Sequence, residues 1–143
     1  MPMDVERMLR RAVQDVFGQD VDAVWDTDPR FPHVQRVALT ADRRSVGLRA
    51  ATTGFFELTV FDLDVSTGFF EYDDEDYMAA LIRQLALVAE AYLRGEGSVV
   101  HDRGFLRTRT FLTITVGGND WKMGRRSSWP HYPEDDSTGC GGT

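Results

Sequence analysis

Cysteine is almost absent from this chain of 143 residues, in which Cys140 is the only one. A single cysteine excludes an internal disulfide framework, so nothing indicates an oxidising compartment and we expect a cytoplasmic protein. Long apolar runs are missing too, because no stretch approaches the roughly 18 apolar residues that a membrane span needs. The charged segment MPMDVERMLRR lacks the apolar centre of a signal peptide. We therefore expect no membrane association.

An excess of positive charge is also missing. The chain has 16 Lys and Arg residues against 23 Asp and Glu residues, and its formal net charge is −7. A nucleic-acid-binding surface needs a basic face that replaces condensed counterions, and binding to anionic lipid needs the same sign of charge. The composition argues against both and favours a basic protein, or a small molecule, as the partner.

Motifs for catalysis and for cofactors are scarce. The sequence has neither the GxxxxGK[ST] loop nor a strand-linked GxGxxG that would hold nucleotide phosphates. His33, His101 and His131 are far apart in sequence and lack the spacing of a zinc site. We therefore expect no catalytic residues, no metal site and no cofactor.

Two helices are predicted from apolar residues that recur at helical spacing. The first begins at Val5, with Asp4 as its N-cap, and ends at Gly18. In the second, apolar residues recur at helical spacing from Tyr77 as far as Gly95, few charges lie between them, and the acidic run before Tyr77 occupies the first turn. We expect this second helix to pack on a sheet and against the first helix, or against a second copy of the chain, so a homodimer stays open.

Strands are predicted between and after the helices. Segments 34–40, 44–51 and 55–63 are joined by short turns, which favours an antiparallel meander. In the third segment the apolar phase changes near Val60 and Phe61, which we interpret as a β-bulge. The predicted fold is α+β: an N-terminal helix, a three-stranded antiparallel meander, a long helix and two or three further strands, with both helices on one face of a single sheet.

One domain is expected, formed by residues 1–126 and followed by a flexible tail, residues 127–143. The 42% of hydrophobic and 27% of charged residues are usual for a single globular domain. The tail is rich in proline, glycine and small polar residues and shows no periodicity.

The segment FFEYDDEDY, residues 69–77, places five carboxylates among four aromatic rings at the start of the second predicted helix. Asp73 or Asp74 as N-cap, followed by further acids, suits a helix start because these groups accept from free backbone N–H groups and oppose the helix dipole. A metal site fits less well, since adjacent acids on a helix point in different directions and the spacing lacks the glycine of a calcium loop.

Capping uses only one or two of these acids, yet residues 50–82 hold eight acidic residues and no basic one. We therefore predict an electronegative, aromatic surface that binds a basic partner; a solvated acidic edge is the alternative. The predicted contact residues are Glu57, Phe69, Glu71, Tyr72, Asp73, Asp74, Asp76 and Tyr77.

The segment LTVFDLDVSTG, residues 58–68, resembles the signature of the haloacid dehalogenase phosphohydrolases, an apolar strand followed by DxDx[T/S]. The resemblance implies Asp62 as a nucleophile, Asp64 as a general acid/base and a bound magnesium ion. The short connections between the predicted strands depart from the parallel sheet of that family. A magnesium-dependent phosphohydrolase is therefore kept as an alternative to a binding protein.

In size, acidity, lack of catalytic motifs and order of helices and strands, the chain resembles the small immunity proteins of bacterial polymorphic toxin systems. The resemblance implies a non-enzymatic protein that occludes a basic toxin site with its acidic aromatic surface. The helix-flanked sheet also resembles the small acidic secretion chaperones, which would require a homodimer.

Overall fold

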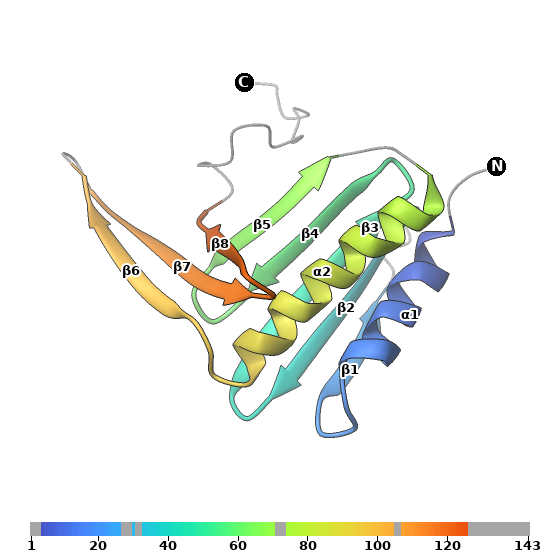
Figure 1. Cartoon of the computed structure of the whole chain (residues 1–143), viewed down its shortest axis with the longest axis horizontal. Helices are drawn as coiled ribbons and strands as arrows, with labels where there is room; N and C mark the ends of the chain where they lie inside the picture. Colours follow the sequence, from blue (N-terminus) through green and yellow to red (C-terminus); the bar gives the residue numbers. More distant parts are fainter. Residues whose placement is uncertain (1–3, 27–29, 31–32, 71–73, 105–106, 126–143) are drawn as a thin grey trace.

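A five-stranded antiparallel sheet carries two helices on one of its faces (Figure 1). The computed structural model describes residues 4–26, 30, 33–70, 74–104 and 107–125. In chain order the elements are α1 (Val5–Val16), β1 (Asp22–Asp26), β2 (Val34–Ala41), β3 (Arg44–Ala51), β4 (Phe55–Val60), β5 (Val65–Phe70), α2 (Glu75–Leu93), β6 (Ser98–Arg103), β7 (Thr108–Val116) and β8 (Asn119–Met123). The predicted α+β class is confirmed; the predicted tail, residues 127–143, lies outside the described residues.

The main sheet is a meander in which the strand order β1-β2-β3-β4-β5 follows the chain. The turn between β2 and β3 has a positive φ at both Asp42 (50°) and Arg43 (72°), the geometry of a tight two-residue hairpin. The predicted three-stranded meander is confirmed as the centre of this sheet. The sequence does not indicate β1 and β5, because β1 is an almost fully exposed edge strand and β5 contains Ser66 and Gly68.

The bulge expected near Val60 and Phe61 is wrong, because the chain turns there and a new strand begins. The backbone N–H of Leu63 donates to the carbonyl of Val60, and that of Asp64 donates to the carbonyl of Phe61, each over 3.3 Å. Asp64 has a φ of 54°, which closes the turn. The apolar phase changes because β4 ends at Val60 and β5 starts at Val65.

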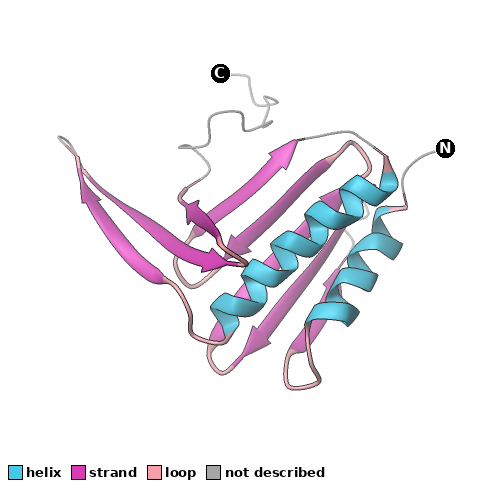
Figure 2. Ribbon diagram, in the orientation of Figure 1, coloured by secondary structure: helices cyan, strands magenta, loops and turns pink. Residues whose placement is uncertain are grey.

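The expectation of a single sheet is also wrong. Strands β6, β7 and β8 form a separate three-stranded antiparallel sheet, whose β6–β7 hairpin extends away from the main sheet (Figure 2). This second sheet contacts α2 and β5. Among the described residues, a backbone bridge joins it to the main sheet: the N–H of Ser66 donates to the carbonyl of Gly124 over 2.7 Å.

Helix α2 lies at the centre of the molecule, in contact with α1, β3, β4 and β7. Its buried residues are Met78, Ile82, Leu85, Ala86, Val88, Ala89, Ala91, Tyr92 and Leu93. Contact on several sides explains why the helix carries so few charges, and the predicted packing on the sheet and on α1 is confirmed. Neither helix among the described residues is long and apolar enough to cross a membrane.

Both helices begin at an aspartate whose side chain caps the first turn. Oδ1 of Asp4 accepts from the backbone N–H of Arg7 over 3.0 Å, and Oδ1 of Asp74 accepts from that of Tyr77 over 2.9 Å. Of the two predicted candidates for the second N-cap, Asp74 holds this role, and Asp73 lies outside the described residues.

Replacing Asp74 by Ala should lower the free energy of unfolding by about 1 kcal/mol, because a backbone N–H of the first turn of α2 loses its acceptor. Asp76→Ala removes the same charge from the same turn and leaves the cap in place, so it should cost only about 0.3 kcal/mol. Urea denaturation of the two variants measures the difference. Equal losses would contradict a capping role for Asp74.

Candidate functional site

One face of the main sheet carries no helix. Along β3, the side chains of Val46, Leu48 and Ala50 are buried on the side of α1 and α2. Because successive side chains alternate along a strand, Gly47 and Arg49 belong to the opposite face. We call this opposite side of the five-stranded sheet the uncovered face, since no described helix or strand packs on it. The register places Val24, Arg36, Arg49, Phe55, Glu57 and Phe70 there.

A row of four charged side chains crosses the uncovered face from β1 to β4. The strand register aligns Asp26 with Arg36, Arg36 with Arg49, and Arg49 with Glu57. Arg36 Nη2 lies 2.7 Å from Asp26 Oδ2, and Arg49 Nη2 lies 2.5 Å from Glu57 Oε1. The row therefore consists of two neighbouring acid–base pairs, which link β1 to β2 and β3 to β4.

Glu57 is a predicted contact residue that the fold withdraws from the surface. It is only 1% exposed, and Arg49 is the partner of its carboxylate. The guanidinium group of Arg49 also lies 5.2 Å from the centre of the Phe55 ring. Within the described residues, the buried Nε of Arg49 has no hydrogen-bond partner. Glu57 thus holds an arginine in place on the uncovered face and does not meet a partner directly.

Large apolar side chains are exposed around this ion pair. Val24 is 64% exposed, Phe61 53% and Phe70 57%. The ring of Phe61 lies over Gly47, where an added Cβ would stand 2.6 Å from a ring carbon, so glycine leaves the space that this ring occupies. Phe70 packs edge-on against Phe55, with ring centres 6.4 Å apart. Exposed apolar residues gathered on one face are typical of a protein contact surface.

Of the neighbouring rings Phe69 and Phe70, the structure exposes the one that was not predicted as a contact residue. Phe69, a predicted contact residue, faces the helix side and packs on the buried Phe56 at 5.7 Å between ring centres. Phe70, absent from the predicted contact residues, is the more exposed ring. Alternation along β5 would have identified Phe70 once residues 65–70 were recognised as a strand.

The acidic start of α2 is partly used by the fold. Asp74 is the N-cap, and Glu75 accepts a hydrogen bond from the Arg7 side chain over 3.3 Å. Asp76 and Tyr77 remain exposed, Tyr77 by 43%. The predicted contact residues Glu71, Tyr72 and Asp73 lie outside the described residues.

The two aspartates of the phosphohydrolase-like signature have partners within the fold. Oδ2 of Asp62 accepts from the backbone N–H of Ser45 over 2.8 Å and from the hydroxyl of Tyr92 over 3.0 Å. Asp64 pairs with Arg125 at 3.5 Å. Both follow a strand of an antiparallel sheet, whereas the resemblance implies a parallel one. Among the described residues, no group of three His, Cys, Asp or Glu side chains could hold a metal ion.

Asp62 fixes the turn that presents Phe61. Its partner Tyr92 lies near the end of α2, and Arg44 at the start of β3 donates to the Tyr92 carbonyl over 3.0 Å. Burial raises the pKa of Tyr92 to about 12; the hydrogen bond to Asp62 and the charge of Asp62 act in the same direction, and Arg44 opposes them. This cluster joins α2, β3 and the β4–β5 turn.

Comparisons with protein-family models, with curated proteins and with solved structures gave no match.

Replacing Glu57 by Leu should lower the free energy of unfolding by about 2 kcal/mol, because Arg49 then remains partly buried without its carboxylate. In the double variant Arg49→Leu/Glu57→Leu, no unpaired charge remains, so most of this loss should be recovered. Urea denaturation of both single variants and the double variant gives the coupling. If the double variant is no more stable than Glu57→Leu, the ion pair with Arg49 does not account for the contribution of Glu57 to the free energy of unfolding.

The free energy of unfolding should decrease at high pH in the wild type, and Tyr92→Phe should remove the part of this decrease that comes from Tyr92. An unfolded tyrosine ionises near pH 10, while folded Tyr92 keeps its proton up to about pH 12. In this window the unfolded state binds fewer protons, so the contribution of Tyr92 is fully present below about pH 10 and is lost as the pH rises through 12. Between pH 10 and pH 12 the melting temperature should fall less steeply for Tyr92→Phe than for wild type. The control Tyr77→Phe should follow wild type. Parallel curves for wild type and Tyr92→Phe would contradict the assignment.

Proposed function

We propose that this chain is a non-enzymatic protein-binding module that holds a basic protein on its uncovered face. The observation that carries the proposal is the exposure of Phe61 and Phe70 on a sheet face that no described element covers. Exposed aromatic rings supply much of the energy of protein contacts, since they bury a large area and lose little conformational freedom. Phe61 is held in place, because its ring occupies the space over Gly47 and the next residue, Asp62, accepts from the backbone N–H of Ser45.

The exposed acidic residues of the chain favour a partner with a positively charged surface. Asp22 on β1 and Asp76 on α2 are exposed, and no ion pair with a described residue engages either side chain. The charged row from Asp26 to Glu57 is internally balanced. The remaining acidic charge attracts a basic surface over a distance and speeds its association.

The partner we propose is a bacterial toxin whose basic active site this surface occludes, which makes the chain an immunity protein. The size, the acidity and the layout of helices and strands support this choice, together with the uncovered face. The exposed aromatic rings give the contact area that occlusion requires, and the acidic residues give the complementary charge.

The test uses the product of the gene adjacent to the one that encodes this chain, expressed alone and together with the chain. We expect the adjacent product to stop growth and the chain to restore it. Phe61→Ser and Phe70→Ser should each weaken the purified complex about tenfold or more, mainly through faster dissociation. Val99→Ser is the matched control, because Val99 is also exposed, by 47%, but lies on β6 of the second sheet.

Asp76→Lys should slow association and reduce its dependence on salt, while the dissociation rate changes little. Surface plasmon resonance at low and moderate ionic strength separates the two rates. If Phe61→Ser and Phe70→Ser bind as tightly as wild type, the uncovered face is not the contact surface. A stable homodimer that buries both rings would instead favour the secretion-chaperone alternative.

A further inference from the structure

Strand β8 changes partner at its end, and this change opens a fork between the two sheets. The last pair that β8 makes with β7 is Met123 with Leu112. The next residue, Gly124, bridges to Ser66 on β5. Residues 108–111 of β7 therefore pair with β6 on one edge, and no described strand pairs with their other edge.

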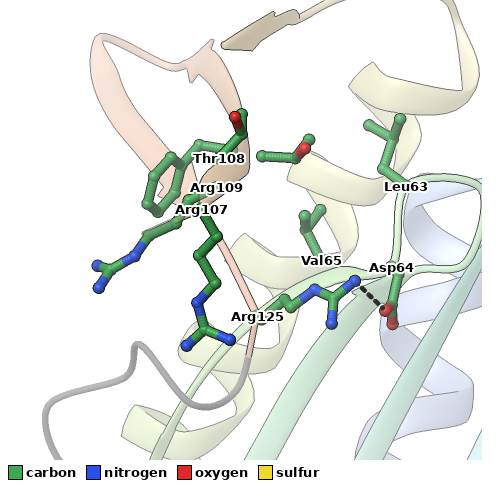
Figure 3. A pocket seen from close by; sticks show the side chains of 9 residues that line it. Leu63, Asp64, Val65, Arg107, Thr108, Arg109 and Arg125 are labelled. Carbon is green, nitrogen blue, oxygen red and sulfur yellow. Dashed lines mark ion pairs between the residues drawn. The ribbon is translucent and has the colours of Figure 1, made fainter. Parts of the chain in front are cut away.

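A groove of about 340 Å³ lies at this fork (Figure 3). Its lining includes Arg107, Arg109 and Phe111 at β7, Asp64 and Val65 at the start of β5, and Arg125 after β8. Figure 3 shows the guanidinium group of Arg125 turned toward Asp64, at 3.5 Å. Arg107 and Arg109 have no ion pair within the described part of the chain.

The groove is positive although the chain as a whole has a net charge of −7. Three arginines and one carboxylate line the groove, and that carboxylate is already paired with Arg125. Lys122 adds a further cation nearby, since its Nζ lies 4.3 Å from the centre of the Phe111 ring that lines the groove. Arginine binds carboxylates through two parallel hydrogen bonds, so the free pair Arg107 and Arg109 suits an acidic ligand.

The backbone of β7 offers hydrogen bonds to the same groove. The N–H of Gly104 donates to the carbonyl of Arg107 over 2.9 Å, so the backbone groups of Arg107 face β6. In an antiparallel ladder this direction alternates, which turns the backbone groups of Arg109 toward β6 and those of Thr108 and Thr110 toward the open edge. Two peptide donors and two acceptors are therefore in position for an added strand.

We propose that this groove binds an extended acidic peptide segment of a partner protein, which adds a strand to the open edge of β7. Side chains two residues apart lie on the same face of a strand, so Arg107 and Arg109 select an acidic residue at every second position, as in Glu-x-Glu. A peptide uses both the arginines and the strand edge, whereas a small anion uses the arginines alone. This site does not depend on the uncovered face or on its partner.

The probe is a labelled synthetic peptide in which Glu alternates with Thr, titrated with the full chain and followed by fluorescence anisotropy. The control peptide has the same composition arranged in Glu-Glu-Thr-Thr repeats, in which no two Glu residues stand two positions apart and share a face in that way. We expect the alternating peptide to bind about tenfold tighter, because only its carboxylates reach both arginines from one strand. Equal affinity for the two peptides would overturn the proposal and leave a general anion site.

Arg107→Gln and Arg109→Gln should each weaken the alternating peptide about tenfold, as expected for the loss of one charge-assisted contact. Arg103→Gln is the matched control. Arg103 is an exposed arginine of the same hairpin, paired with Thr108, so it lies on the other face and outside the groove. Its substitution should change the affinity less than about twofold. Equal effects of all three changes would show nonspecific attraction and overturn the proposal.

The strand pairing has its own test. Two further peptides are N-methylated at every second residue, one at the odd positions and the other at the even positions. Only every second N–H of an added strand faces β7, so one of the two peptides should lose binding and the other should keep it. Unchanged binding of both would contradict strand addition. Binding seen only after removal of residues 127–143 would assign the groove to the acidic tail of the chain itself. Self-association abolished by Arg107→Gln would assign it to a second copy; either result overturns the proposal.

Discussion

The burial of α2 is the constraint on which the rest of the structure depends. This helix has apolar residues over most of its circumference, and α1, β3, β4 and β7 together cover them. One face of one sheet could not bury so wide an apolar surface, so the second sheet leans against the helix from the side of β5. Both helices lie on the same side of the main sheet, and no described helix or strand packs on its opposite face.

The two candidate binding surfaces are consequences of this arrangement. The uncovered face exists because no described element packs behind β1 to β5, and its rings are held by polar contacts such as that of Asp62 with Ser45 and Tyr92. The groove exists because β8 leaves β7 in order to reach β5 at Ser66. The first surface presents exposed apolar rings, and the second presents two arginines beside a strand edge that no described strand pairs with.

Much of the fold could be predicted because its signals are local. Asp4 and Asp74 cap helices whose apolar spacing is visible in the sequence, and Asp42-Arg43 forms the predicted hairpin turn. The edge strand β1 was not predicted, because most of its residues are exposed and its sequence therefore shows no apolar alternation. The turn at 61–64 resembled a bulge because both shift the apolar phase by one position.

The sequence by itself determined the two helices, the central meander and an acid-rich stretch, since helix spacing, caps and short turns depend on neighbours along the chain. Only the tertiary structure decided which residues reach the surface. Glu57 and Asp76 look alike as acids of that stretch, yet strand register pairs Glu57 with Arg49 and buries it, while Asp76 stays exposed. Likewise, no described strand pairs with the edge of β7 beside Arg107 and Arg109, because β8 turns away from it to bridge to β5. Such contacts join residues far apart in the chain, which no local pattern records.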